Sequence, residues 1–304
     1  MTLPWTGVYP AITTKFAPDG ALDIPAFLKN IQAQLDAGID GLILGGSLGE
    51  SSTISHDERM ELLQATLDFV GGRIPVLVNI AEGSTRNAVA LAERAQSNGA
   101  QGLMVLPPMM YKPTDRETTD FFIAVAQSTD LPILIYNNPV DYKIEVTLDM
   151  FEELLKFKNI QAVKESTRDL SNVTRIRRRF GNDLKVLCGV DTLALESLLM
   201  GADGWVAGLV AAFPRETVAI YRLAKAGRVE EAIAIHRWFL PILELDINPQ
   251  LVQNIKLAEV MTGLGTEYVR PPRQPLMGAE RERVIRILEE GLAIRPELPD
   301  YLRM

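Results

Sequence analysis

The sequence predicts a (β/α)8 TIM barrel followed by a C-terminal helical extension, on two observations. Eight short apolar runs alternate with amphipathic helical stretches between residues 7 and 207 of the 304-residue chain, which is typical of parallel βαβ units. The runs are apolar throughout, as in residues 42–44 and 103–106, and this favours strands buried on both faces. An open doubly wound sheet shares the alternation, but eight units within roughly 200 residues favour closure into a barrel.

The expected strands follow one another at regular intervals, and a similar phrase precedes three of them. Residues 37–41 read Ala-Gly-Ile-Asp-Gly, residues 98–102 read Asn-Gly-Ala-Gln-Gly, and residues 200–204 read Met-Gly-Ala-Asp-Gly. The first glycine suits the residue after a helix, where a positive φ is needed, and the second opens the next strand. We therefore expect a recurring loop at the N-terminal end of the barrel. The strands are residues 7–13, 41–44, 75–79, 102–106, 132–136, 160–164, 185–188 and 204–207.

From residue 215 onward the pattern is helical only. Clear breaks fall at Gly227 and at residues 270–272 (Arg-Pro-Pro). We divide the chain into a barrel, residues 1–214, and a C-terminal helical region, residues 215–304. No low-complexity linker separates the two, so we expect the helical region to pack on the barrel. Its helices are expected over about residues 215–226, 229–245, 249–263 and 279–293.

The composition excludes several classes of function. A formal net charge of −8 argues against a nucleic-acid surface or a polybasic membrane patch. One cysteine, Cys188, and two distant histidines, His56 and His236, provide neither a disulfide framework nor a zinc-like cluster. Apolar runs are too short to span a membrane, and residues 1–5 do not begin a signal peptide. We expect a cytoplasmic protein that binds a small molecule.

Active sites of such barrels lie at the C-terminal ends of the strands. Lys164 closes an apolar strand at that end, within residues 163–166 (Val-Lys-Glu-Ser), whereas Lys185 begins a strand. A partly desolvated amine there has a lowered pKa, and its neutral form can attack a carbonyl carbon. The alternative is a strand-end lysine that reaches water or pairs with Glu165. Position alone does not decide between the two.

Two other strand ends carry candidate groups. Residues 46–49 (Gly-Ser-Leu-Gly) form a turn whose backbone N–H groups can converge on a carboxylate, with the Ser47 hydroxyl beside them. A plain βα turn that needs glycine for its dihedral angles is the alternative. Tyr136 ends the fifth run, and its phenol can transfer protons to and from a carbinolamine. The alternative is an aromatic residue at the rim whose hydroxyl meets water.

Together these segments resemble the N-acetylneuraminate lyase and dihydrodipicolinate synthase superfamily. The resemblance is carried by residues 46–51 (Gly-Ser-Leu-Gly-Glu-Ser), 136–139 (Tyr-Asn-Asn-Pro) and 163–166, and residues 189–191 (Gly-Val-Asp) and the helical tail also match. It covers nearly the whole chain. It implies a (β/α)8 barrel, usually a homotetramer, whose lysine on strand six condenses with a 2-oxo acid such as pyruvate. No metal or organic cofactor is implied.

The resemblance also implies roles for individual residues. Lys164 would form the Schiff base, and Tyr136 would transfer protons. A 2-oxo acid carboxylate would be held by Ser47 and the Leu48 N–H group, and other residues would line the pocket or face the rest of the substrate. The substrate-binding residues are Gly46, Ser47, Leu48, Asn138, Asp141, Gly189, Val206 and Met110.

Departures from the superfamily pattern at three positions bear on the reaction. The synthases carry an arginine after Tyr-Asn-x-Pro that grips a second carboxylate, but Asp141 stands there in this chain and would repel one. Lys143 is a poorer carboxylate fork than arginine. Many members have a tyrosine after strand four that reaches a neighbouring subunit's site, where this chain has Met110 with Tyr111 beside it. Leu48 stands where a second hydroxyl residue is common.

These departures leave three reactions and one non-catalytic alternative. We expect a dehydratase or deaminase that acts on a 2-oxo acid or a related imino acid, for example on 1-pyrroline-4-hydroxy-2-carboxylate. Aldol cleavage of a 4-hydroxy-2-oxo acid is the second choice, and dihydrodipicolinate synthesis is the third. A barrel that has lost catalysis is the last. A dimer or tetramer is expected from the resemblance alone.

Overall fold

A computed structural model describes residues 2–304 of the chain. Its eight parallel strands form one sheet in the order β1-β8-β7-β6-β5-β4-β3-β2. A parallel bridge between Ala11 and Ile43 joins the two ends of this sheet, so the strands close into a barrel and the predicted fold is confirmed. The strands are β1 (Gly7–Pro10), β2 (Leu42–Leu44), β3 (Val76–Ile80), β4 (Gly102–Val105), β5 (Ile133–Asn137), β6 (Ile160–Glu165), β7 (Lys185–Cys188) and β8 (Gly204–Ala207).

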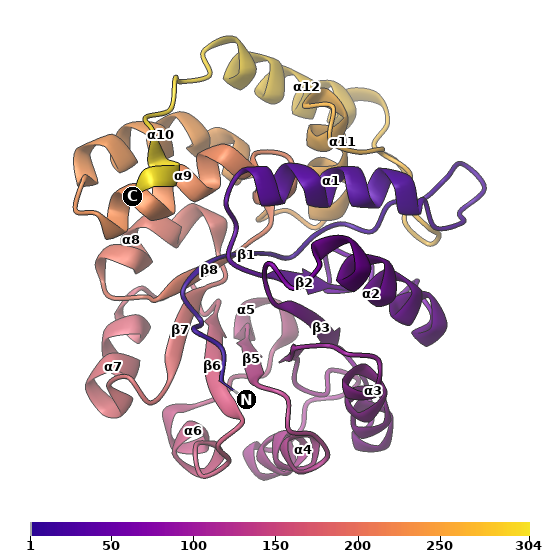
Figure 1. Cartoon of the computed structure of the whole chain (residues 1–304), viewed down its shortest axis with the longest axis vertical. Coiled ribbons are helices and arrows are strands. Elements are labelled where there is room, and N and C mark those ends of the chain that lie inside the picture. Colours follow the sequence, from indigo (N-terminus) through magenta and orange to yellow (C-terminus); the bar gives the residue numbers. More distant parts are fainter. Residues whose placement is uncertain (1) are drawn as a thin grey trace.

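Helices surround the strands in a ring, and the C-terminal helices gather along one side of it (Figure 1). The ring contains helices that return the chain from one strand to the next, as right-handed βαβ units require. Those between strands are α1 (Ile24–Asp36), α2 (His56–Val70), α3 (Thr85–Ser97), α4 (Asp115–Gln127), α5 (Pro139–Tyr142), α6 (Leu148–Leu154), α7 (Ser171–Phe180) and α8 (Ala194–Leu199). Those that follow β8 are α9 (Pro214–Lys225), α10 (Val229–Leu243), α11 (Leu251–Met261) and α12 (Gly278–Ala293).

The repeated phrase forms the same loop three times, as predicted. Gly38, Gly99 and Gly201 have φ angles of +84°, +86° and +105°, which only glycine adopts at little cost. The residue two positions later also repeats its role. Asp40 Oδ2 accepts a hydrogen bond from Val8 N at 2.9 Å, and the side chains of Gln101 and Asp203 accept equivalent bonds from Val76 N of β3 and Val186 N of β7. The loop thereby ties each strand to its neighbour at the N-terminal end of the barrel.

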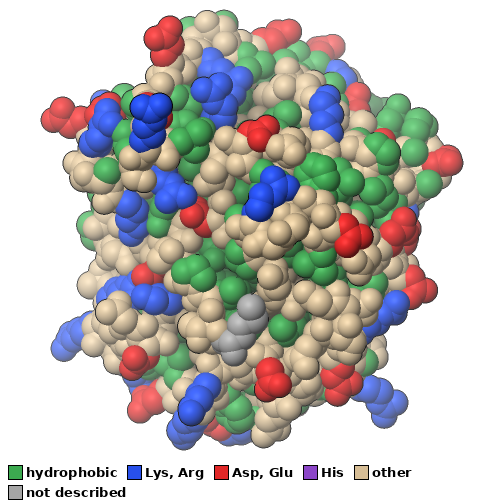
Figure 2. Space-filling view, viewed as in Figure 1, with side chains coloured by type: hydrophobic (Ala, Val, Ile, Leu, Met, Phe, Trp, Pro, Cys, Tyr) green, Lys and Arg blue, Asp and Glu red, His purple; other side chains and the backbone are tan. Residues whose placement is uncertain are grey.

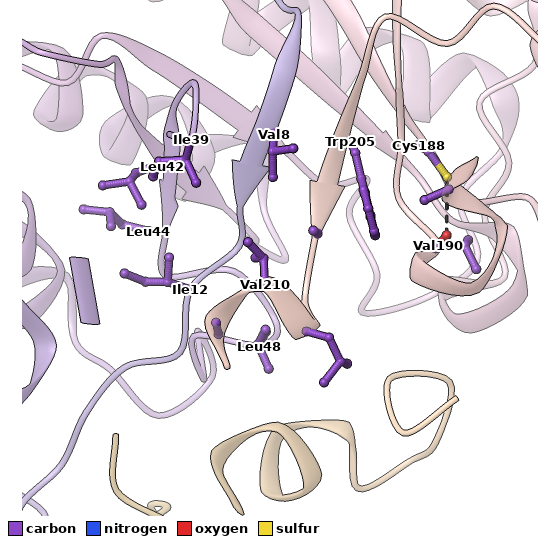
Figure 3. Packing of buried hydrophobic residues seen from close by; sticks show 14 of the residues in the cluster. Val8, Ile12, Ile39, Leu42, Leu44, Leu48, Cys188, Val190, Trp205 and Val210 are labelled. Atoms are coloured by element: carbon purple, nitrogen blue, oxygen red, sulfur yellow. Dashed lines mark hydrogen bonds between the residues drawn. The ribbon is translucent and has the colours of Figure 1, made fainter. Parts of the chain in front are cut away.

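Apolar side chains form two clusters, one inside the barrel and one between the strands and the helices. The inner cluster is closed at the N-terminal end by Trp5, whose Nε1 donates a hydrogen bond to Gln161 Oε1 at 2.9 Å. The chain therefore crosses the floor of the barrel before it enters β1 (Figure 1). The outer cluster includes Val8, Leu42 and Trp205 (Figure 3). Because the inner cluster fills the N-terminal end of the barrel, a site can lie only at the C-terminal ends of the strands.

The C-terminal helices pack on the barrel. Helix α9 lies against β1 and β8. Helix α11 is joined to the C-terminal end of the barrel by two ion pairs whose side chains have no exposed surface. In one, Lys15 Nζ lies 2.8 Å from Glu259 Oε1, and in the other Lys256 binds Glu50. The division of the chain at residue 214 stays a prediction.

Charged side chains of both signs are interspersed on the face that surrounds the barrel floor (Figure 2). That face carries no continuous basic stripe of the kind that binds nucleic acid. Among residues 2–304, none of the helices combines the length and the apolar character that crossing a bilayer requires.

Candidate active site

A cavity opens at the C-terminal ends of the strands. Nine of the ten residues predicted from the sequence line it, and Met110 does not. The nine are Gly46, Ser47, Leu48, Tyr136, Asn138, Asp141, Lys164, Gly189 and Val206. Segments as distant as the β2–α2 loop and the C-terminal end of β8 therefore meet at one place.

Lys164 points into this cavity from β6. Its neighbour Glu165 points to the opposite face, where the carboxylate accepts hydrogen bonds from Thr167 N at 2.8 Å and Asn172 Nδ2 at 2.9 Å. Lys164 is only 7% exposed. The strand alternation thus separates the two side chains, and neither pairing with Glu165 nor full hydration describes the lysine.

Gly189 makes room for the lysine stem. A Cβ atom at this position would lie 2.6 Å from both Cγ and Cε of Lys164 and 2.2 Å from Ser166 Oγ. No carbon atom fits at such distances. The glycine at the end of β7 is therefore a requirement for placing the amine, which explains its position in the predicted site.

Burial lowers the pKa of Lys164 from its usual value, while Tyr142, Asp246 and Asp191 act in the opposite direction. Burial dominates because the described part of the chain places no carboxylate within ion-pairing distance of the amine. The result is an amine that loses its proton more readily than an exposed lysine. Its neutral form is the nucleophile required for attack on a carbonyl carbon.

Tyr136 lies directly beside the lysine. The two residues are paired in the register of β5 and β6, and Lys164 Nζ lies 3.9 Å from the centroid of the Tyr136 ring. The Tyr136 hydroxyl accepts a hydrogen bond from Asn138 Nδ2 at 3.2 Å. Burial raises the pKa of Tyr136 to about 12, so the phenol holds its proton at neutral pH and can donate it.

The turn at residues 46–49 presents donors to the same cavity. Within residues 2–304, the N–H groups of Ser47 and Leu48 have no hydrogen-bond acceptor. The turn is held from behind, because Thr14 Oγ1 donates to the Gly49 carbonyl at 2.7 Å and Asn79 Nδ2 donates to the Gly45 carbonyl at 3.1 Å. Two fixed, free N–H groups form the kind of concavity that binds a carboxylate.

Leu48 contributes its backbone and not its side chain to this site. Its side chain is 5% exposed and belongs to the outer apolar cluster, close to Val210 in Figure 3. A hydroxyl group at position 48 would therefore have to replace a packed apolar side chain. The departure from the superfamily pattern at this residue fits the local packing.

Tyr142 is a cavity residue that sequence reasoning missed. The short helix α5 turns the chain after Asn138 and brings the Tyr142 hydroxyl to 2.6 Å from Ser47 Oγ. Its ring meets that of Tyr136 edge to face, with 5.5 Å between centroids. Burial raises the pKa of Tyr142 above its usual value. The chain itself thus supplies a second phenol beside Ser47 and Tyr136.

Asp141 lies at the wall of the cavity and is partly neutralised. Asn138 Nδ2 donates to its Oδ2 at 2.8 Å, and Arg168 Nη2 lies 3.5 Å from its Oδ1. Arg168 also lines the cavity and was not predicted, because nothing in the sequence places the β6–α7 loop opposite α5.

The segment between α10 and α11 supplies the remaining wall, which sequence reasoning also missed. Asp246, Ile247 and Leu251 line the cavity, although they lie in the region expected only to pack on the barrel.

Met110 and Tyr111 lie elsewhere, after β4, and are 81% and 57% exposed. Neither reaches the cavity of its own chain, and their predicted roles therefore depend on a neighbouring subunit. Across residues 2–304, no group of three His, Cys, Asp or Glu side chains is arranged to hold a metal ion.

The fold and the site together define a (β/α)8 enzyme of the class I type, in which a lysine forms a Schiff base with a carbonyl substrate. The chain belongs to the dihydrodipicolinate synthetase family, whose model matches residues 4–291. It is 34% identical over 290 residues to 4-hydroxy-tetrahydrodipicolinate synthase of Acidothermus cellulolyticus, which covers 95% of this chain and 92% of that protein.

Two further proteins illustrate the likeness. 4-Hydroxy-tetrahydrodipicolinate synthase 1 of Halalkalibacterium halodurans is 30% identical over 287 residues, which are 94% of this chain and 95% of that protein. The crystal structure of dihydrodipicolinate synthase from Aquifex aeolicus superposes with a TM-score of 0.89 at 29% identity, covering 94% of this chain and 97% of that one. The membership predicted from three short motifs is confirmed along the chain.

Proposed function

We propose that this enzyme forms an imine between Lys164 and a 2-oxo acid, or a related cyclic imino acid, and then eliminates a hydroxyl group from it. The proposal is supported above all by one observation: a buried amine faces the free N–H groups of Ser47 and Leu48 in one cavity. A 2-oxo acid has a carboxylate next to its carbonyl carbon. The two N–H groups suit the carboxylate, and the amine suits the carbon.

The imine makes the next bonds reactive. Lys164 Nζ attacks the C2 carbonyl carbon, and the oxygen leaves as water after proton transfers that we assign to the Tyr136 hydroxyl, whose ring lies beside the amine. The resulting positively charged imine withdraws electrons, so a proton can leave C3 and an enamine forms. The nitrogen lone pair then re-forms the C2=N bond, and the C2–C3 π electrons move to form a C3=C4 double bond, which breaks the C4–O bond and expels the hydroxyl group. Hydrolysis of the lysine imine releases the product and restores the amine. With the cyclic imino acid, Lys164 displaces the ring nitrogen from C2 and this nitrogen stays on C5; after the elimination, tautomerisation turns it into a C5 imine, which hydrolyses to the aldehyde and ammonia.

Elimination is favoured over synthesis because of Asp141. A synthase must hold a second substrate that carries its own carboxylate. Asp141 occupies the position after the Tyr-Asn-Asn-Pro motif, and its carboxylate is already bound by Asn138 and faced by Arg168. A hydroxylated chain finds acceptors at this wall, whereas a second carboxylate meets a like charge.

A product panel tests this proposal. Purified enzyme is incubated separately with 1-pyrroline-4-hydroxy-2-carboxylate and with a 4,5-dihydroxy-2-oxo acid, and 2-oxoglutarate semialdehyde, ammonia and pyruvate are measured. Elimination predicts the semialdehyde from both compounds, with ammonia from the first only. Release of pyruvate in place of the semialdehyde would contradict elimination and assign aldol cleavage. Absence of every product, together with absence of a lysine adduct, would contradict catalysis of this kind altogether.

A further inference from the structure

Asp246 is a carboxyl group in the cavity that the imine chemistry does not use. It lies in the segment that joins α10 to α11, outside the barrel sequence, and it lines the cavity together with Lys164. Its side chain packs directly on Gly208, since a Cβ atom there would lie 2.7 Å from Asp246 Oδ1. The carboxyl group is thereby seated against the backbone that follows β8.

The carboxyl group of Asp246 has no partner among residues 2–304. No donor or cation of that part of the chain hydrogen-bonds or ion-pairs with it. The residue is half-buried, and its open side faces the cavity. Asp191, which lies behind it, is saturated by contrast, because Trp205 Nε1 and the N–H groups of Gly208 and Leu209 all donate to its oxygens. A carboxyl group left open beside a saturated one is available to a ligand.

The charges around Asp246 favour its protonated form. Burial raises the pKa of Asp246 to about 8, and the nearby charges of Asp191 and Asp141 act in the same direction. Lys164 and Arg168 oppose this effect and do not overcome it. Tyr136, which also faces it, is neutral at these pH values. Near neutral pH the group therefore carries a proton that it can give away.

We infer that Asp246 is the general acid of the reaction, which protonates the hydroxyl group that leaves C4 of the imine-bound substrate. This inference rests on the proposed elimination. When the enamine electrons break the C4–O bond, the oxygen takes the Asp246 proton and departs as water. The carboxylate that remains is reprotonated from solvent through the open cavity. The alternative aldol cleavage needs the opposite, a base that removes the proton of the C4 hydroxyl.

The decisive variant is Asp246→Asn, which keeps the shape of the side chain and removes the acidic proton. Elimination by this variant is assayed with 1-pyrroline-4-hydroxy-2-carboxylate. The two earlier steps are assayed with pyruvate: borohydride trapping on Lys164 reports imine formation, and exchange of the C3 protons in deuterated water reports enamine formation. Glu244→Gln is the matched control, because it removes an exposed carboxyl group from the same segment.

The expected result is loss of elimination by about 10²- to 10⁴-fold, the usual contribution of a general acid, with trapping and exchange nearly unchanged. In the unaltered enzyme, elimination should fall as the pH rises through about 8, because the acid form is lost there. This limb of the profile should disappear in Asp246→Asn and persist in Glu244→Gln.

Two results would overturn the inference while leaving the imine proposal intact. One is normal elimination by Asp246→Asn. The other is trapping of pyruvate on Lys164 in an enzyme that eliminates from neither test compound. Failure of the unaltered enzyme to form any borohydride-trapped adduct on Lys164 would instead contradict the imine proposal itself.

Discussion

At the scale of single residues, the site depends on what surrounds the buried Lys164 amine. Gly189 leaves the volume that the lysine stem occupies, and Tyr136 covers the amine at 3.9 Å. Burial then lowers the pKa of the amine, and no carboxylate of the described chain forms an ion pair with it that would reverse the effect. The same burial raises the pKa of Tyr136. Burial disfavours the charged form of either group, so it favours a neutral lysine amine and a neutral, protonated phenol side by side.

The second phenol gives a prediction at this scale. Tyr142→Phe removes the hydroxyl group that contacts Ser47, and we expect proton exchange at C3 of pyruvate to slow by about 10²-fold. Nuclear magnetic resonance in deuterated water measures this exchange. Tyr268→Phe, which alters an exposed tyrosine outside the cavity, is the control. A loss confined to Tyr111→Phe would assign the relay to Tyr111 and contradict the prediction.

Sequence predicts some of these residues and not others for a clear reason. Lys164, Tyr136 and the turn after β2 end strands, and the end of a strand is readable from an apolar run. Tyr142 depends on a four-residue helix that turns it back toward Ser47. The position of Asp246 depends on how α10 and α11, which are far from Lys164 in the sequence, pack on the barrel. Neither position follows from local pattern.

At the scale of elements, the turn after β2 is held in place by the C-terminal helices. Glu50, the glutamate of the Gly-Ser-Leu-Gly-Glu motif, does not face the cavity. Its carboxylate binds Lys256 of α11 and accepts a hydrogen bond from Arg270 N at 3.1 Å. The motif therefore joins a substrate-binding turn to a structural anchor. The predicted helices 249–263 and 279–293 match α11 and α12, but this link between elements could not be read from their sequence.

This anchor predicts a large effect on stability. Glu50→Gln leaves the buried Lys256 without its charge partner, and removal of one partner from such a pair costs about 3–5 kcal/mol. Urea denaturation measures the free energy of unfolding. The double variant Glu50→Gln/Lys256→Met should recover part of the loss, because no buried charge remains. Glu231→Gln, which breaks an exposed pair with Arg228, should change little, and an equal loss there would refute the argument.

At the scale of the whole molecule, barrel and helical region build one site. The barrel provides the amine and the carboxylate-binding turn, and the segment before α11 provides Asp246. The fold was predictable because its eight strands and the repeated loop are local patterns. The role of the helical region was not, since only the assembled structure places residue 246 opposite residue 164.

The exposed pair Met110 and Tyr111 gives a prediction at this scale. An exposed fraction of 81% for Met110 fits a surface that a second copy of the chain covers, as the resemblance to oligomeric relatives implies. We expect a dimer or tetramer by sedimentation velocity, and we expect Met110→Arg to shift the distribution toward smaller species. A monomer at all accessible concentrations would contradict this expectation.

The central claim is that Lys164 forms an imine with a 2-oxo acid, and reductive trapping tests it most directly. The enzyme is incubated with pyruvate and borohydride, digested, and analysed by peptide mass spectrometry, with Lys164→Ala as the control. We predict a reduced pyruvate adduct on Lys164 and none in the Lys164→Ala enzyme, whose circular dichroism should remain that of the folded barrel. A folded enzyme whose Lys164 remains unmodified after treatment with borohydride and pyruvate, or any other 2-oxo acid tried, would contradict the claim.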